Sequence, residues 1–159
     1  MNSIHFIGMS TQDARHLQAG RADHHGHSPE HQISDGDGNP CRHCLEMIGK
    51  NEPMLVVSYR PFETTNPYAE QGPIFLHAKE CAAFCNPDGE LPPVLRDSAS
   101  YLLRGYSDEE RIVYGSGGVV HTSVLTDRAA HLLAQPNIAF VDVRSASNNC
   151  WQARILRSD

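Results

Sequence analysis

The sequence predicts an α+β fold whose sheet is mainly antiparallel. Several short runs rich in β-branched and aromatic residues are typical of strands, among them residues 54–59 and 138–143. The helical patterns are short, and loops with Pro, Gly and Asn separate neighbouring strand runs, which favours hairpins. A chain of 159 residues with this mixture is expected to form one domain over residues 1–159.

The N-terminal segment predicts a strand followed by a helix. Residues 4–9 have the pattern of a short strand. Ser10 or Thr11 is expected to cap a helix that carries Leu17 on its apolar face and ends at Gly20.

The next segment, residues 21–40, differs in composition from the rest of the chain. It is rich in His, Gly and Asp, and Ile33 is its one large aliphatic residue. Such a segment cannot contribute much to a core, so we expect a flexible loop here.

The middle of the chain predicts a hairpin followed by a short helix. Residues 54–59 and 73–77 are two strands, most simply antiparallel, and residues 64–72 are the loop that connects them. Residues 78–84 have the pattern of a short helix, which is followed by a turn rich in Asn, Pro, Asp and Gly.

The C-terminal part predicts one more helix and another hairpin. The helix is expected between Thr126, as its cap, and Pro136, which ends it. The remaining segments are residues 100–105 and 111–114, and two strands at 138–143 and 151–156 joined across residues 145–149.

Composition and charge exclude several classes of function. The net charge is −6 with neutral His, and no basic stripe is visible, so neither nucleic acid nor an anionic membrane surface is an expected partner. No apolar run is long enough to cross a bilayer, and the first residues lack the pattern of a secretion signal. We therefore expect a cytoplasmic protein, in which the five Cys are ligands, core residues or catalysts rather than disulfides.

Two pairs of metal-ligating residues flank the predicted hairpin. Cys41 and Cys44 form a Cys-x2-Cys pair, and His77 and Cys81 lie four residues apart. Thiolates and imidazoles in two such pairs are typical of a tetrahedral zinc site. The order of knuckle, hairpin and short helix predicts a treble-clef-like site, with Cys85 as an alternative ligand in place of Cys81 or His77.

Other interpretations of these cysteines remain open. Cys41 and Cys44 could be a redox pair of the thioredoxin kind, although Pro40 and the preceding loop do not supply the strand that such a pair requires. The thiols could also be small core residues. A zinc with four protein ligands would be structural, whereas a zinc with three would keep a position for water.

Weaker candidates lie elsewhere in the chain. Arg144, Asn149 and Arg60 are candidates for binding a small anion, and Cys150 beside Arg144 is a candidate thiol nucleophile. A purely structural role for these residues is the alternative. The His-rich tract could also bind a transition metal weakly, through His24, His25, His27 and His31.

Several of these motifs together resemble a known family. They are PCRHCL at residues 40–45, SYRPF at 58–62, YAE at 68–70, GPIFLHA at 72–78, LRGY at 103–106 and VRSASNNC at 143–150. They resemble the bacterial domain-of-unknown-function 1203 family, DUF1203, over residues 4–157. The resemblance implies that Cys41, Cys44, His77 and Cys81 are the recurring ligand-like residues, and that Arg144 and Cys150 match the closing motif, whereas Cys85 is outside the pattern.

Two hypotheses of function follow. The first is a bacterial zinc-binding protein with a structural zinc, acting as a binding module for a small anionic ligand or a protein partner. The second is an enzyme that uses Cys150 with a base such as His5 or His121, or an open zinc site for hydrolysis. The oligomeric state and the ligand do not follow from the sequence.

Overall fold

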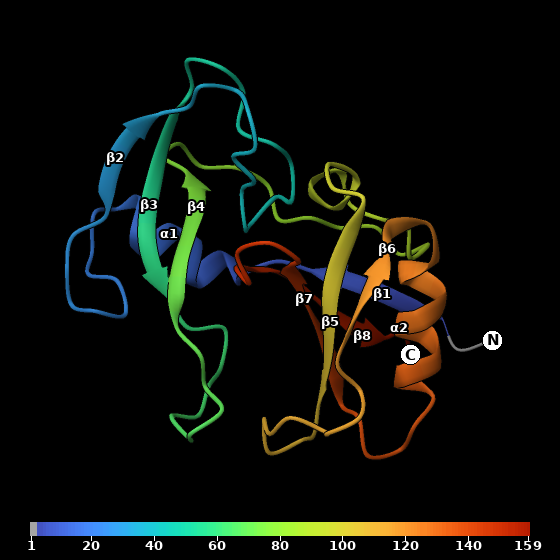
Figure 1. Ribbon diagram of the computed structural model, residues 1–159. Coiled ribbons are helices and arrows are strands. Elements are labelled where there is room, and N and C mark those ends of the chain that lie inside the picture. Colours follow the sequence, from blue (N-terminus) through green and yellow to red (C-terminus); the bar gives the residue numbers. More distant parts are fainter. Residues whose placement is uncertain (1–2) are drawn as a thin grey trace.

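The computed structural model describes residues 3–159. Within this range the chain forms two sheets that lie side by side, one of five strands and one of three, with one α-helix against each (Figure 1). All the pairings between these strands are antiparallel. The predicted α+β fold with mainly antiparallel sheets is confirmed.

The five-stranded sheet brings together the two ends of the chain. Its spatial order is β1-β8-β7-β5-β6. The strands are β1 (Ile4–Ile7), β5 (Ser100–Tyr106), β6 (Gly118–His121), β7 (Phe140–Ser145) and β8 (Trp151–Arg157). β7 and β8 form the predicted hairpin, and β1 pairs with the far side of β8.

One face of this sheet is apolar and the other carries charge. Helix α2 (Leu125–Leu133) packs on the apolar face, where alternate residues of β5, β7 and β8 are buried with it. The alternation follows from the two-residue period of a strand. The opposite face carries Arg104, Asp142, Arg144 and Arg154, of which Asp142 is fully buried and ion-paired with Arg154 at 2.7 Å. This charged face turns toward the loop that follows β3.

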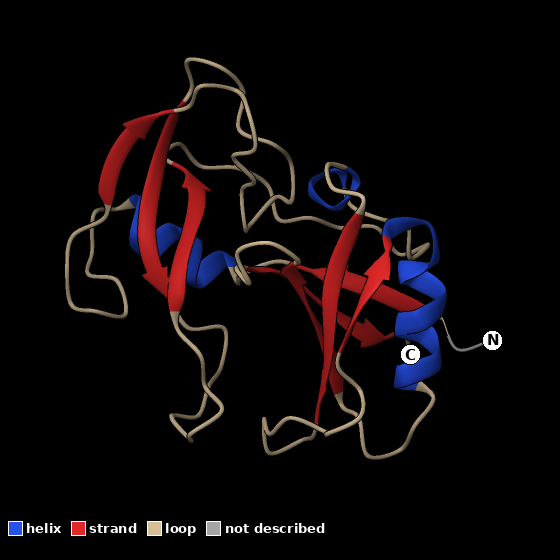
Figure 2. Cartoon of the chain, in the orientation of Figure 1, coloured by secondary structure: helices blue, strands red, loops and turns tan. Residues whose placement is uncertain are grey.

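The three-stranded sheet has the order β2-β3-β4 and packs on α1 (Figure 2). Its strands are β2 (Glu30–Ile33), β3 (Pro53–Tyr59) and β4 (Gly72–His77), and α1 spans Thr11–Gln18. The Ser10 side chain, one of the two caps that the sequence predicted, accepts a hydrogen bond from the Asp13 N–H at 3.0 Å. Ala14 and Leu17 of α1 are buried against the aliphatic residues of β3 and β4.

The prediction of a loop over residues 21–40 is wrong at residues 30–33, which form β2. All four residues of β2 are exposed, so the strand has no apolar face that a sequence pattern could reveal. It is held by backbone pairing with β3 alone. The edge strand β6 was missed for the same reason, since it has no buried residue.

The prediction of a short helix over residues 78–84 is also wrong. Residues 78–92 contain neither helix nor strand, and the 3-10 turn Pro93–Arg96 follows them. Residues 111–114 form only an isolated bridge between Tyr106 and Ile112. Among residues 3–159, no helix is both long and apolar enough to cross a membrane.

Candidate metal centre

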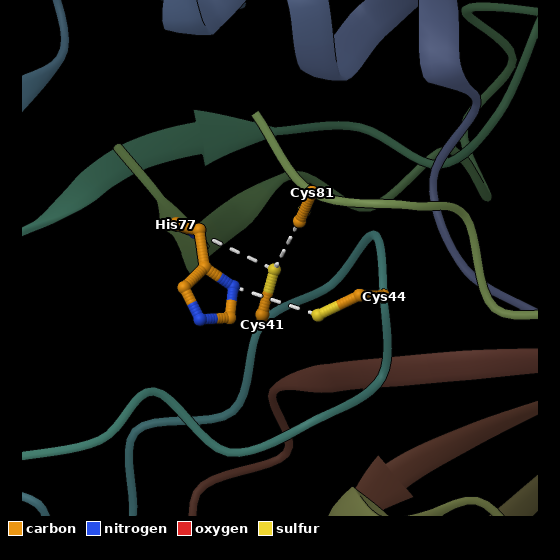
Figure 3. Close-up of side chains that lie close together, drawn as sticks. All are labelled: Cys41, Cys44, His77 and Cys81. Atoms are coloured by element: carbon orange, nitrogen blue, oxygen red, sulfur yellow. Dashed lines mark hydrogen bonds between the residues drawn. The ribbon is translucent and has the colours of Figure 1, made fainter. Parts of the chain in front are cut away.

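Four side chains converge at one end of the β3–β4 hairpin. Cys41 and Cys44 come from the knuckle that precedes the hairpin, His77 is the last residue of β4, and Cys81 lies in the irregular segment that follows. One ligand atom from each lies within 4.8 Å of the other three. Figure 3 shows the side chains pointing toward one another, with Cys41 at the centre. The group could hold a metal ion.

The distances within the group are those of ligands and not of a disulfide. The Sγ atoms of Cys41 and Cys81 are 3.9 Å apart, and Sγ of Cys44 is 3.5 Å from Nδ1 of His77. A disulfide would require about 2.0 Å between two sulfurs. All four thiols of this part of the chain, including that of the exposed Cys85, are free. The structure brings Cys81 and not Cys85 to the group.

The knuckle is a tight turn locked by backbone hydrogen bonds. Leu45 N–H donates to the Cys41 carbonyl at 3.1 Å, and Cys41 N–H donates to the Glu46 carbonyl at 2.9 Å. Leu45 is fully buried and adopts the left-handed conformation with φ of 55°. The turn is joined to β4 through a hydrogen bond from Arg42 N–H to the Phe75 carbonyl at 3.1 Å. Both sulfurs of the knuckle are therefore held on the side of His77.

A glycine allows the knuckle to touch the end of β1. Met9 N–H donates to the Arg42 carbonyl at 2.7 Å. A Cβ atom on Gly8 would lie 2.3 Å from that carbonyl oxygen and 2.9 Å from the carbonyl oxygen of His43. Any larger residue at position 8 would force the backbones apart, so the close approach requires glycine.

Side chains of α1 hold the segment that carries Cys81. The Arg15 guanidinium donates to the Cys81 carbonyl at 2.7 Å, and the Gln18 amide donates to the carbonyls of His77 and Lys79, each at 2.9 Å. The carbonyls of His77 and Lys79 would accept hydrogen bonds from N–H groups four residues later if residues 78–84 formed a helix. Because α1 satisfies them instead, the segment remains irregular and delivers Cys81 to the group.

Outer partners orient the ligands. Nε2 of the His77 ring lies 3.6 Å from a Glu52 carboxylate oxygen. The backbone N–H of His77 donates to Sγ of Cys41 at 3.4 Å. A carboxylate behind a ligating His fixes its ring and raises its basicity. Glu52 was not predicted from the sequence. It directly precedes β3, and the start of β3 pairs with the end of β4, so an antiparallel hairpin places Glu52 near His77.

His43 is a second outer partner that sequence reasoning missed. It is fully buried between the two cysteines of the knuckle, and burial lowers its pKa. Nδ1 lies 3.2 Å from Sγ of Cys81, and Nε2 lies 2.9 Å from the Thr11 hydroxyl. A neutral imidazole with its proton on Nδ1 donates to the sulfur and accepts from the hydroxyl, so both contacts are satisfied.

Within the group, the pKa of the Cys41 thiol is lowered and the pKa values of the other two cysteines are raised. A hydrogen bond from Cys44 lowers the pKa of Cys41 to about 3, although burial acts against it. The same hydrogen bond, together with burial, raises the pKa of Cys44, and burial raises the pKa of Cys81. A hydrogen bond with Cys41 raises the pKa of His77. The arrangement holds one thiolate, and a metal ion would displace the protons from the other ligands.

A buried arginine balances the charge of the site. Arg42 is 3% exposed; its Nε donates to the Trp151 carbonyl at 2.7 Å and its Nη1 to the Pro40 carbonyl at 2.9 Å. Burial lowers the pKa of Arg42 to about 10, and the Cys150 and Cys41 thiols act in the opposite direction, so it is charged at neutral pH. A divalent ion with three thiolates and a neutral imidazole carries a net charge of about −1, which a guanidinium offsets.

Comparison with known families agrees with this part of the chain. A family model described as a protein of unknown function, DUF1203, matches residues 38–157. The chain belongs to the DUF1203 family. The match starts at residue 38, after the segment rich in His, and includes all four residues of the metal site. No curated protein and no solved structure matches the chain at a significant level.

The weaker candidates of this DUF1203 protein do not line one pocket. Arg144, Asn149 and Cys150 border a cavity between the β3–β4 hairpin and the β7–β8 turn. Arg60 borders a neighbouring cavity with Arg154 and Glu63, and its Nη1 donates to the Gln71 side chain at 3.3 Å. The Cys150 sulfur has the Asn148 carbonyl as a weak acceptor at 3.8 Å. His5 and His121 instead contact Ser158 and Ser123.

The His-rich tract forms no comparable group in residues 3–159. There the one cluster of His, Cys, Asp or Glu with the spacing of a metal site is that of Cys41, Cys44, His77 and Cys81. Nδ1 of His24 accepts a hydrogen bond from the Arg60 N–H at 2.7 Å, and its ring stacks on Tyr59.

Proposed function

We propose that this DUF1203 protein binds one zinc ion and uses it structurally, as the fixed point of a binding module. The ligands in this proposal are Cys41, Cys44, His77 and Cys81. The remainder of the protein, in particular the region between the two sheets, supplies the surface that contacts a ligand or partner.

The spacing of the four ligand atoms is the observation that carries the proposal. Zinc binds sulfur at about 2.3 Å and nitrogen at about 2.0–2.1 Å in a tetrahedron, which places two sulfurs about 3.8 Å apart and a sulfur and a nitrogen about 3.6 Å apart. The corresponding distances here are 3.9 Å between Cys41 and Cys81 and 3.5 Å between Cys44 and His77. Three thiolates and one imidazole are a donor set that favours zinc over harder cations.

A structural role is supported by the number and the origin of the ligands. Four protein ligands fill a tetrahedral shell, and a catalytic zinc needs one position for water. The ligands come from three parts of the chain that share no continuous sheet or helix. The knuckle also contacts the five-stranded sheet, through Arg42 to Trp151 and through Gly8. A bound zinc would therefore fix the hairpin, the knuckle and the segment of residues 78–92 relative to one another.

The alternative of a thiol enzyme has less support. A nucleophilic Cys needs a base within hydrogen-bond reach. Neither of the two cavities that Cys150 borders is lined by a histidine, and its sulfur contacts a backbone carbonyl.

Metal analysis of protein purified without a His tag tests the proposal. We expect one zinc per chain, and none in the Cys41→Ser/Cys44→Ser double variant. The Cys85→Ser variant is the matched control, because Cys85 is exposed and outside the group, and it should keep its zinc. Zinc retained at full stoichiometry by the double variant would contradict the assignment of the ligands.

Replacement of zinc by Co²⁺ tests the structural role. A shell of three thiolates and one imidazole should give intense ligand-field bands of a tetrahedral ion that do not change on addition of azide or cyanate. Weak five-coordinate bands, or bands that shift with these anions, would indicate an open position and would favour the hydrolytic alternative.

A further inference from the structure

A cavity of about 220 Å³ lies between the two sheets, and none of the four residues of the candidate metal site lines it. The end of β3 and the start of β4 form one wall of the cavity, and the β7–β8 turn forms the other. Figure 1 shows this turn between the two sheets. Tyr59, Ile74 and Trp151 give it an apolar side, and Arg144, Asn149 and Gln71 give it a polar side.

Two buried hydrogen-bond donors at this cavity have no partner. Arg144 is 4% exposed and Trp151 is 5% exposed, and both border the cavity. Nε of Arg144 and Nε1 of Trp151 are buried and have no hydrogen-bond acceptor among residues 3–159. Trp151 also borders the cavity of Arg60, whose Nε is buried without an acceptor as well. Buried N–H groups are almost always paired, and leaving one unpaired is costly. Two residues with unpaired donors border this one cavity, which favours a bound molecule with acceptor atoms there.

The charges around the cavity do not cancel. Arg104 and Arg144 share one carboxylate: Nη1 of Arg104 lies 2.5 Å from Oε1 of Glu70, and Nη1 of Arg144 lies 3.2 Å from Oε2. The nearby Asp142 is already paired with Arg154 at 2.7 Å. Two guanidinium groups and one carboxylate leave one positive charge, which favours a ligand with a single negative charge.

The turn that carries Asn149 is shaped around Arg144. Asn149 has a left-handed backbone with φ of 58°, and its carbonyl accepts a hydrogen bond from Nη1 of Arg144 at 3.0 Å. Its side-chain oxygen lies 3.4 Å from Nη2 of Arg104. The Cys150 N–H donates to the Ser145 hydroxyl at 3.0 Å, which closes the turn. Arg144 is thus held in place by Glu70 and by the turn, while its Nε is left without a partner.

We infer that this cavity binds a small monocarboxylate, whose oxygens accept hydrogen bonds from Arg144 Nε and Trp151 Nε1. The short apolar part of the ligand lies against Tyr59 and Ile74. The volume suits a ligand of few heavy atoms, since sites for drug-sized ligands span about 300–1,000 Å³. A phosphate dianion fits less well, because only one positive charge is in surplus and the Glu70 carboxylate borders the same cavity.

This inference rests on the proposed binding-module function and names the ligand class. The chain has one tryptophan, so its indole N–H gives a single, unambiguous signal in a ¹H–¹⁵N spectrum. We would titrate the zinc-loaded protein with propionate, with propionamide as a neutral isostere, with phosphate, and with sodium chloride at matched ionic strength. Propionate should move the Trp151 indole signal in a saturable way, and the other three solutes should do so weakly or not at all.

Three variants make the test specific. Arg144→Lys keeps the charge and removes Nε, and it should weaken propionate binding at least about tenfold, as expected for a hydrogen bond to a charged group. Glu70→Gln removes the competing carboxylate and should tighten binding by roughly threefold or more. Arg21→Lys is the matched control at an exposed position and should leave the affinity unchanged.

Each outcome decides the inference. A shift that is not saturable, that sodium chloride reproduces, or that persists unchanged in Arg144→Lys would mean that ordered water alone satisfies the donors, and would overturn it. Tighter binding of phosphate than of propionate would overturn the ligand class. If Arg144→Lys does not fold, Glu70→Gln decides, because unchanged or weaker binding there contradicts the charge argument. Zinc content measured on the same samples separates this inference from the proposed zinc site.

Discussion

The two sheets of this protein are stabilised in different ways. The five-stranded sheet buries one face of four of its strands together with α2, and its core is made mainly of large aliphatic and aromatic side chains from those strands and that helix. The three-stranded sheet has a smaller core, its edge strand β2 is exposed on both faces, and Cys41 is one of its buried core residues. Residues 78–92, which contribute Cys81 to its candidate metal site, contain neither helix nor strand.

This difference agrees with the position of the candidate metal site, which among residues 3–159 lies beside the three-stranded sheet. Burial of apolar surface stabilises a helix on a sheet without further help, at about 1.5–3 kcal/mol for each large side chain. A hairpin with long irregular connections has less surface to bury and more chain entropy to overcome. In the proposed function, a zinc ion with four ligands would supply the missing free energy through bonds that only the folded arrangement can form.

The largest expected effect is that of removing one ligand. Cys44→Ser should lose zinc and with it a contribution to stability on the order of 10 kcal/mol at neutral pH, because the energy of binding a structural zinc is energy of folding. Chemical denaturation of zinc-loaded wild type, Cys44→Ser and the Cys85→Ser control measures it. A Cys44→Ser protein as stable as the control would contradict the proposal that the three-stranded sheet depends on zinc and the five-stranded sheet does not.

A substitution in the core of the five-stranded sheet should lower the stability of the protein and leave its zinc affinity unchanged. Leu132 of α2 is 1% exposed, and Leu132→Ala should lower the free energy of unfolding by about 2–5 kcal/mol because it leaves a cavity. Its zinc affinity, measured by competition with a chelator, should equal that of wild type when the protein is folded. A large loss of zinc affinity in the folded variant would show that the two regions are not separately stabilised.

The Glu52 carboxylate behind His77 offers a test of how much the surroundings of the ligands contribute to zinc affinity. Glu52→Gln removes the charge behind Nε2 of His77 and keeps an oxygen that can accept the Gly49 N–H hydrogen bond. The variant should bind zinc about tenfold to a hundredfold more weakly and remain folded when zinc is saturating. Competition titrations with a zinc indicator give the affinity. An unchanged zinc affinity would mean that Glu52 only stabilises the turn, through its hydrogen bond with the Gly49 N–H.

The smallest effect is expected at the cap of α1. Ser10→Ala removes the hydrogen bond to the Asp13 N–H and should cost about 1 kcal/mol of stability, whereas Ser10→Asp, which keeps a capping oxygen, should cost little. Because Arg15 and Gln18 of the same helix hold the Cys81 segment, the loss should be accompanied by faster release of zinc. A fall in stability with an unchanged rate of zinc release would show that α1 does not influence the metal site.

Much of this arrangement was predictable from the sequence. The strands and the helix with internal apolar periodicity, such as α2, the β7–β8 hairpin and the β3–β4 hairpin, were found, because burial imposes the pattern that sequence reasoning detects. The exposed edge strands β2 and β6 were not, since backbone pairing alone leaves no pattern of side chains. The segment of residues 78–84 had a helical pattern, but α1 side chains occupy its carbonyls.

The site was predictable in its ligands and not in its surroundings. Cysteine and histidine spacing identified the four residues that the structure brings together. Glu52, His43 and Thr11 contact them from positions with no distinctive spacing, so only the folded chain reveals them. The grouping of Arg60 with Arg144 and Asn149 stays a prediction: Arg60 lines a neighbouring cavity, and its guanidinium contacts Gln71, which borders the cavity of the other two.

Hydrogen exchange followed by mass spectrometry, with and without zinc, tests the central claim most directly. Removal of zinc should abolish protection of backbone amides in residues 38–85, including the hairpin of β3 and β4, while β5, β7 and β8 of the five-stranded sheet keep most of theirs. Restoring zinc should restore protection in the first region. Equal protection of both sheets with and without zinc, in a protein shown to bind the metal, would contradict the account.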